Sequence, residues 1–187
     1  MKPKQLELLV LSAQSGNSGS LELLYRYYSP RMRRFAITLV PIAYVDDIVQ
    51  LVWLKVFKRM ARLDDPAVFA SWLYRALRWE AADWHKKPEN LNQQDIEAHT
   101  QTIEEQQETG IAEYHEIESG SALALAMTQL SLIEQQVIQL HYLSEMSLQQ
   151  IALSLDIPLG TAKSRLHRAR ETLRKVLIKT HVENNDE

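Results

Sequence analysis

Residues 147–175 read SLQQIALSLDIPLGTAKSRLHRARETLRK, and this stretch decides the fold. Its first part has apolar residues at i, i+3, i+4 and i+7, the spacing of one buried helical face: Leu148, Ile151, Ala152 and Leu155. The pattern breaks at Asp156-Ile157-Pro158, where the proline suits the first turn of a new helix. The apolar spacing then resumes at Ala162, Leu166, Ala169 and Leu173. The sequence therefore predicts a helix-turn-helix.

The second helix of this pair is basic on the side that the apolar residues leave outside. Seven Lys or Arg residues and one acidic residue, Glu171, lie between Leu159 and Lys179. Long cations reach DNA phosphates and release counterions, whereas shorter polar groups near the helix start can reach base edges. A solvated basic face is the alternative, but the capped helix and proline turn ahead favour major-groove binding. The predicted base readers are Lys163, Ser164 and His167, and the other predicted DNA contacts are Thr161, Arg165, Arg168, Arg170 and Arg174.

The net charge of −3 hides three unlike segments. Residues 1–87 carry 14 Lys/Arg and 8 Asp/Glu, residues 88–120 carry none and 9, and residues 121–187 carry 7 of each. The middle segment also lacks an apolar pattern, so it cannot bury enough surface to offset its ordering entropy. We expect an acidic flexible linker at 88–120 between two helical domains, 1–87 and 121–187. The linker could simply stay extended, or it could imitate nucleic acid and mask the basic faces.

Helical periodicity and capping signals extend over both predicted domains. Apolar residues at 3–4 residue spacing predict helices from about Leu21 to Leu39, capped by Ser20, from about Tyr44 to Met60, and from about Val68 to Lys86. After the linker, a helix is expected over 122–130, and capping boxes at 131–134 and 147–150 open two more. The expected fold class is all-α, with two small helical domains.

Several function classes are disfavoured by composition. The chain has no cysteine, which excludes disulfide scaffolds and cysteine-ligated zinc and fits a cytoplasmic location. No apolar run approaches the roughly 18–20 residues that span a bilayer, so no membrane insertion is expected. Asp46 and Asp47 are adjacent, so on a helix they point about 100° apart rather than at one reacting atom. No His pair has metal-site spacing and no phosphate loop occurs. We expect neither an enzyme nor a cofactor, metal or small-molecule substrate.

Both ends of the chain resemble one protein family. Residues 131–142, 146–152 and 157–170 (the last reading IPLGTAKSRLHRAR) resemble region 4 of bacterial RNA polymerase sigma factors of the small extracytoplasmic-function (ECF) class. The earlier blocks are similar to region 2 of the same class: Leu24-Tyr25 to Tyr28, Pro30-Arg31, Asp46 to Gln50 with Trp53 and Phe57, and Phe69 with Trp72 to Arg75. Response regulators carry a related helix-turn-helix, but they would need an α/β receiver domain.

The resemblance implies partners and site residues. It implies that region 2 docks on core RNA polymerase and opens the −10 element of promoter DNA, that region 4 reads the −35 element, and that an anti-sigma factor binds the protein. The residues implied for polymerase docking are Asp46, Asp47, Gln50, Leu51, Trp53 and Leu54. Those expected at the −10 element are Arg62, Ser71, Arg75, Arg78, Trp79 and Lys86, with 62–71 as a pocket loop. The acids at 46 and 47 could instead only stabilise a helix N-terminus through its dipole.

Two tryptophans and one rival function stay open at this point. Trp72 lies within the apolar pattern, which favours a core position. Trp79 stands where the family usually has a small polar residue, so it either stacks on DNA or packs on the domain. A repressor or activator that never docks on polymerase would explain the helix-turn-helix equally well. It would leave the pattern from Asp46 to Phe57 unexplained.

Overall fold

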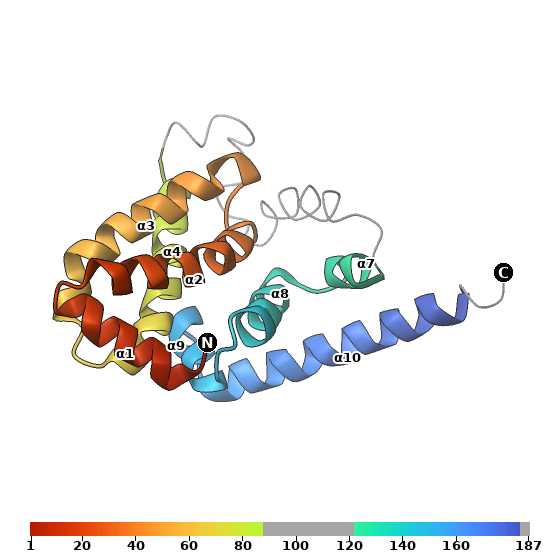
Figure 1. The fold of residues 1–187 in the computed structure, drawn as a ribbon. Coiled ribbons are helices and arrows are strands. Elements are labelled where there is room, and N and C mark those ends of the chain that lie inside the picture. Colours follow the sequence, from red (N-terminus) through yellow and green to blue (C-terminus); the bar gives the residue numbers. More distant parts are fainter. Residues whose placement is uncertain (88–121, 184–187) are drawn as a thin grey trace.

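The protein is all-helical wherever a computed structural model describes it, namely over residues 1–87 and 122–183 (Figure 1). The first range holds α1 (Pro3–Gln14), α2 (Ser18–Ala36), α3 (Val45–Arg59) and α4 (Phe69–His85), with 3-10 turns η1 (Ile42–Tyr44), η2 (Met60–Arg62) and η3 (Pro66–Val68). The second holds α7 (Ala122–Thr128), α8 (Leu132–Ile138), the π-helical turn η4 (Gln139–Leu143), α9 (Leu148–Leu155) and α10 (Leu159–Glu183). The predicted all-α, two-domain fold class is confirmed. The predicted linker lies outside the described residues.

The N-terminal part is a bundle in which α2, α3 and α4 share one core. Leu24, Val52 and Leu73, one from each helix, are fully buried. Aromatic side chains complete this core, because the Phe35 and Tyr74 rings meet edge to face with centroids 5.3 Å apart. The three predicted helices therefore form as the apolar spacing indicates, because each buries one apolar face in the shared core.

The start of α2 differs from the prediction. Asn17, not Ser20, is the N-cap: its side-chain Oδ1 accepts a hydrogen bond from the Ser20 backbone amide at 2.9 Å. The helix begins at Ser18, and the Ser20 hydroxyl donates to Ser12 Oγ on α1 at 2.9 Å. The Asn17 side chain thus accepts the hydrogen bond of an amide that has no partner within the helix, as an N-cap does. Ser20 therefore lies inside the first turn and does not cap it.

Helix α1 was not predicted, and its packing shows why. Val10 is buried, whereas Leu8 and Leu11 are 65% and 48% exposed. Apolar residues therefore lie on both sides of this helix, which blurs the periodic pattern. At its end, the Gln14 side chain donates to the backbone carbonyls of Met60 and Leu63, at 2.9 and 2.7 Å.

The C-terminal part contains the predicted helix-turn-helix as α9 and α10. Both capping boxes form, with the Ser131 amide bonded to the Glu134 carboxylate at 3.0 Å and the Gln150 amide bonded to Ser147 Oγ at 3.2 Å. Between the two helices Asp156 caps α9 with a left-handed backbone, φ 57° and ψ 46°, a conformation that Asp and Asn tolerate better than most residues. Helix α10 packs on α7, α8 and α9 and extends well beyond the rest of the protein toward the C-terminus (Figure 1).

The two parts contact each other chiefly where α4 packs against α9. Buried residues of both parts join in one continuous apolar cluster. Among the described helices, none combines the length and the hydrophobicity that crossing a bilayer requires.

Candidate nucleic-acid interface

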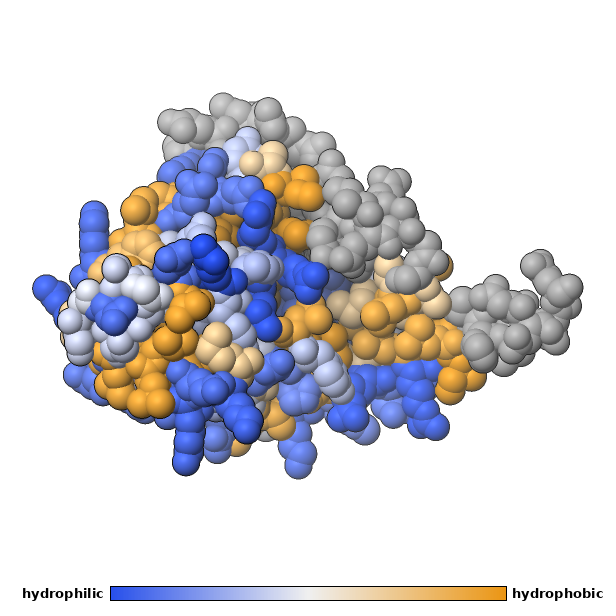
Figure 2. Space-filling model, viewed as in Figure 1, coloured by the Kyte–Doolittle hydropathy of each residue, from blue (hydrophilic) through white to orange (hydrophobic). Residues whose placement is uncertain are grey.

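The exposed side of α10 carries cations in two lines. Successive helical residues are about 100° apart, so Lys163, Arg170 and Arg174, spaced i, i+7 and i+11, form one line. Arg165 and Arg168 lie on the opposite flank, and His167 and Ser164 lie between the two lines. All of these are exposed except Arg165, which is half-buried like Thr161. In Figure 2 hydrophilic side chains extend from the lower edge of the protein, where Figure 1 places α10.

This arrangement suits a helix that lies in a DNA groove. The cations on the two flanks can reach phosphates on either side, while Ser164 and His167 are short enough to approach base edges. The Ser164 hydroxyl donates to the Thr161 carbonyl at 3.0 Å, which leaves its oxygen free to accept a hydrogen bond. The opposite side of α10 is apolar, with Ala162 and Ala169 fully buried. The geometry therefore presents two of the predicted base readers, Ser164 and His167, between predicted phosphate contacts, with Lys163 in line with Arg170 and Arg174.

A second basic surface lies on α4, and it settles the surroundings of Trp79. The Trp79 side chain is 58% exposed, so it does not pack into the domain core. The Arg75 guanidinium carbon lies 4.9 Å from the centroid of its ring, a cation–π contact. Further along, Lys86 is exposed, 3.8 Å from the Asp83 carboxylate. A flat aromatic face beside cations suits unpaired bases, which stack on aromatic rings.

A cavity of about 290 Å³ opens between the end of α3 and the start of α4. It is lined by Arg59, Arg62, Leu63 and Trp72. Trp72, expected in the core, is only half-buried: one side contacts Phe69, with ring centroids 6.2 Å apart, and the other side lines the cavity. The volume is near the lower end of the range for small-ligand pockets. Two guanidinium groups and an indole suit a planar group next to a phosphate.

The exposed face of α3 combines acidic and apolar side chains. Asp46, Asp47 and Gln50 are exposed, as are Leu51 at 41% and Leu54 at 56%. The Asp46 carboxylate pairs with the Arg33 guanidinium at 2.6 Å, but both side chains are more than half exposed, so the pair is weak. This surface suits a partner helix with cations along its edge.

Trp53 differs from the other residues predicted on this face. Its side chain is only 2% exposed, and it lies between the rings of Tyr25 and Phe57, with centroids 5.3 and 5.4 Å away. It therefore supports the exposed face from inside the bundle.

The α4 surface is tied to α9 by polar contacts. The Ser71 hydroxyl donates to the Gln150 carbonyl at 3.2 Å, and Arg78 Nη1 donates to the Ser154 carbonyl at 3.3 Å. Arg75 Nη2 lies 3.5 Å from Asp156 Oδ2. Of the residues predicted for the −10 element, Ser71, Arg75 and Arg78 therefore face α9.

Burial at this contact shifts the pKa of two ionisable groups. Burial lowers the pKa of the Arg78 guanidinium, and the Arg75 charge acts in the same direction while Asp156 opposes it. Burial also raises the pKa of the Tyr74 hydroxyl above its usual value, so the group stays protonated. Its oxygen lies 2.6 Å from Ser144 Oγ, a hydrogen bond between α4 and the turn before α9.

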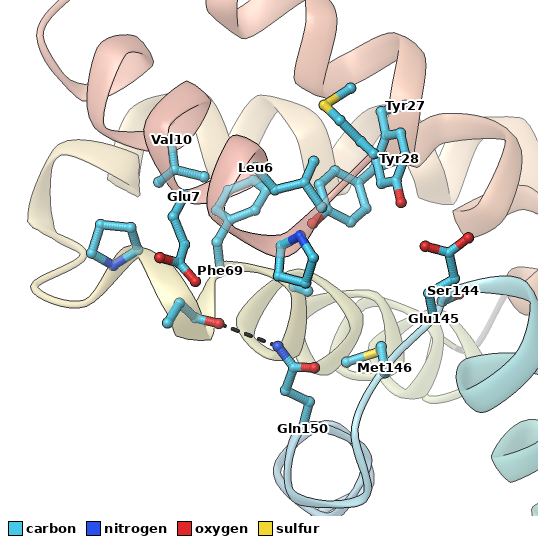
Figure 3. Close-up of a pocket in the computed structure, with 15 residues that line it drawn as sticks. Leu6, Glu7, Val10, Tyr27, Tyr28, Phe69, Ser144, Glu145, Met146 and Gln150 are labelled. Carbon is cyan, nitrogen blue, oxygen red and sulfur yellow. Dashed lines mark hydrogen bonds between the residues drawn. The ribbon is translucent and has the colours of Figure 1, made fainter.

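A small cavity at the edge of this contact is not a ligand site. Figure 3 shows Leu6 and Val10 of α1 and Tyr27 and Tyr28 of α2 across from Met146 and Gln150, whose side-chain amide donates to the Ala67 carbonyl at 3.4 Å. The cavity measures about 70 Å³. That is room for about two water molecules and far below the roughly 300 Å³ of ligand pockets.

Comparison with known proteins finds matches for both parts of the chain. The Sigma-70 region 2 family matches residues 24–89, and the Sigma-70, region 4 family matches residues 120–173. The ECF RNA polymerase sigma factor SigW of Bacillus subtilis is 32% identical over 148 residues, covering 71% of this chain and 74% of SigW. The chain belongs to the ECF family of sigma factors. The Escherichia coli ECF sigma-E factor is 26% identical over 181 residues, covering 89% of this chain and 91% of sigma-E.

Two solved structures share the fold of this sigma factor. CnrH, solved in complex with the cytosolic domain of CnrY, is 21% identical with a TM-score of 0.62, covering 93% of this chain and 97% of CnrH. The sigma factor RpoE of Bartonella quintana, solved with the anti-sigma factor NepR, is 20% identical with a TM-score of 0.57 over 83% and 95% of the two chains.

Family membership confirms the resemblance read from the sequence. As a sigma factor, the chain binds RNA polymerase and promoter DNA and directs promoter-specific initiation of transcription. The region 4 match contains α9 and α10 as far as Leu173, and the region 2 match runs from within α2 to just past α4. Helix α1 lies outside both matches.

Three residues of these surfaces were missed at the sequence level. Tyr74 fits the apolar pattern of α4, and only its hydroxyl identifies a contact with the other domain. Asp156 was treated as part of the turn, although its carboxylate faces Arg75. Gln14 has no sequence signal at all, because its two acceptors lie 46 and 49 residues away.

Proposed function

We propose that this sigma factor divides promoter recognition between residues 1–87 and 121–187, with residues 88–120 as the linker. The first part docks on core polymerase and opens the −10 element, and the second reads the −35 element. The cation lines of α10, with shorter polar side chains between them, are the observation that carries this proposal. This arrangement supports duplex binding by one part while α4 and its cavity serve single-stranded DNA.

At the −35 element, Lys163, Ser164 and His167 read bases and the arginines contact phosphates. Because Ser164 and His167 lie between the cation lines, the flanking arginines fix the depth of the helix in the groove. Thr161 lies at the helix start, where the free backbone amides attract a phosphate.

At the −10 element, an unpaired base enters the cavity lined by Arg62 and Trp72. The indole of Trp72 offers a stacking surface at its wall, and the two arginines beside it can hold the adjoining phosphates. Trp79, held flat by Arg75, supplies a second stacking surface along α4. Ser71, Arg78 and Lys86 complete the track for the backbone of the strand.

Core polymerase binds the exposed face of α3. Asp46, Asp47 and Gln50 suit polar or basic groups of a partner helix, and Leu51 and Leu54 supply the apolar contact. Trp53 keeps this face rigid from below.

The sigma factor also has a partner that restrains it. Both solved relatives hold another protein, the cytosolic domain of CnrY or the anti-sigma factor NepR. We propose an anti-sigma factor for this chain, a cytoplasmic location and no catalytic activity of its own.

One experiment tests the whole proposal. The purified protein is mixed with core polymerase and a promoter library, and transcripts are sequenced. We expect co-elution with core polymerase and transcripts that share an upstream and a downstream element. A protein that binds duplex DNA but neither co-elutes nor directs initiation would act as a repressor or activator instead.

A further inference from the structure

The cavity between α3 and α4 is lined by side chains that donate hydrogen bonds and accept none. The residues that line it in the described part of the chain are Arg59, Arg62, Leu63 and Trp72. A guanidinium carries several N–H donors, an indole carries one, and neither has an acceptor atom, while leucine is apolar. A group that enters this cavity therefore meets donors and positive charge on its walls.

The backbone acceptors on either side of Arg62 are engaged as well. The Met60 carbonyl accepts the Gln14 side-chain amide at 2.9 Å and the Leu63 backbone amide at 3.0 Å, which uses both of its lone pairs. The Leu63 carbonyl accepts the Gln14 amide at 2.7 Å. Because Gln14 belongs to α1, a helix outside the region 2 match decides which polar groups this loop offers.

The carboxylates close to the cavity do not supply an acceptor to it. Asp64 and Asp65 follow in the chain but do not line the cavity, and Asp65 Oδ1 accepts the Ala67 amide at 2.9 Å. Further along α4, the Glu80 carboxylate pairs with Lys55 of α3. The donor-rich character of the cavity is therefore not offset by the acids around it.

An unpaired base that enters the cavity leads with the group farthest from its sugar. This group is a keto oxygen in guanine (O6) and thymine (O4), and an amino group in adenine (N6) and cytosine (N4). A keto oxygen accepts from a guanidinium, which keeps donors for the base even when it also holds a phosphate. An amino group at the same place would be an unpaired donor beside two positive charges, and it would lose its hydrogen bonds to water.

We propose that the cavity selects a keto base, thymine or guanine, from the unpaired −10 strand, and that Gln14 sets this preference as a positioning residue. The proposal rests on the proposed function, which places a base of the −10 strand in this cavity. Arg59 and Arg62 donate to the keto oxygen, while Gln14 withholds the carbonyls that would accept from an amino group.

The test uses the holoenzyme, assembled from the full chain and core polymerase, and a promoter DNA whose non-template strand is unpaired across the −10 element. The DNA sequence comes from a promoter that the holoenzyme selects. The captured position is located first, as the one where removing the base lowers the affinity of the wild type but not that of Trp72→Ala. If no position behaves in this way, the cavity takes no base, and its proposed function fails together with the inference.

Matched bases at the captured position then compare the two leading groups. Uracil carries a keto oxygen where cytosine has its amino group, and hypoxanthine does so relative to adenine. In the pair that binds more tightly, we expect the keto base to bind about tenfold tighter than the amino base, the effect of one unpaired buried donor. Thymine and guanine, compared at the same position, show which size of keto base the cavity takes. Equal affinities within the tighter pair, or tighter binding of its amino base, would overturn the inference while the cavity remained a base site.

The part of Gln14 is tested with Gln14→Leu, which frees the two carbonyls. The keto-to-amino ratio should then fall from about tenfold to about twofold, because an amino group gains an acceptor. Gln5→Leu is the matched control, since Gln5 is the other glutamine of α1 and its side chain accepts the Lys2 amide at 3.0 Å instead of reaching the loop. A loss of affinity that is equal for keto and amino bases would mean that Gln14 only supports the loop, and its part in base choice would fail. An equal fall in the ratio with Gln5→Leu would overturn that part too.

Discussion

The two lines of cations on α10 predict how binding to −35 duplex depends on salt. Each phosphate contact contributes about −0.9 to the slope of log affinity against log salt concentration. Four arginine side chains of this surface are assigned to phosphates, so the full helix should give a slope of about −3.6. Arg170→Ala with Arg174→Ala removes two from one line, and the slope should fall to about −1.8. Both side chains are exposed, so folding should not suffer.

The two slopes predict a large difference in how much affinity for duplex DNA the wild type and the double variant lose as salt is added. Between 50 and 200 mM salt, the wild type should lose about 150-fold in affinity and the double variant about 12-fold. Fluorescence anisotropy with a −35 duplex from a holoenzyme-selected promoter measures both, together with a scrambled duplex of equal length. Ser164→Ala is the control, because it should keep the slope and reduce only the preference for the −35 sequence over the scrambled one. An unchanged slope in the double variant would refute the assignment of these arginines to phosphates.

Three further changes probe the other surfaces. Asp47→Lys reverses an exposed charge on α3 and should weaken binding to core polymerase about tenfold, measured by competition, while −35 duplex affinity stays constant. Trp72→Ala removes a stacking wall of the cavity and should cost about 1–3 kcal/mol in capturing the −10 strand; promoter opening followed with a fluorescent base analogue should slow, and normal opening would argue against a base in the cavity. Leu73→Ala leaves a hole in the core and should lower the free energy of unfolding by about 2–5 kcal/mol, measured by urea denaturation; a smaller loss would show that the bundle relaxes around it.

Local patterns predicted local structure well. The helices α2, α3 and α4 and the pair α9 and α10 follow from apolar spacing, because each buries one face. The capping boxes at Ser131 and Ser147 form because both partners are within one turn. The prediction of the α2 N-cap was wrong because Asn17 and Ser20 are both residue types that cap helices. The local pattern does not decide between them, and in the structure the helix begins directly after Asn17.

Contacts between distant segments could not be predicted from the sequence. Nothing in the spacing of α4 shows that Tyr74 meets Ser144, 70 residues away, or that Arg78 meets Ser154. Trp53 was expected at the docking surface from the family resemblance, yet it is buried on the same face of α3 as Val49, and the rings of Tyr25 and Phe57 contact it. The side of a helix that faces solvent could be predicted from the spacing within that helix. The contacts that a neighbouring helix adds could not.

The hydrogen bonds of Gln14 have a consequence for protein engineering. Its amide donates to the carbonyls of Met60 and Leu63, which follow α3 on either side of Arg62 in the cavity wall. A graft cut at the boundary of the region 2 match would begin at residue 24 and omit α1. The transplanted bundle would keep every residue of the cavity but lose the support of its loop. A modular exchange of promoter preference should therefore carry α1 along with the bundle.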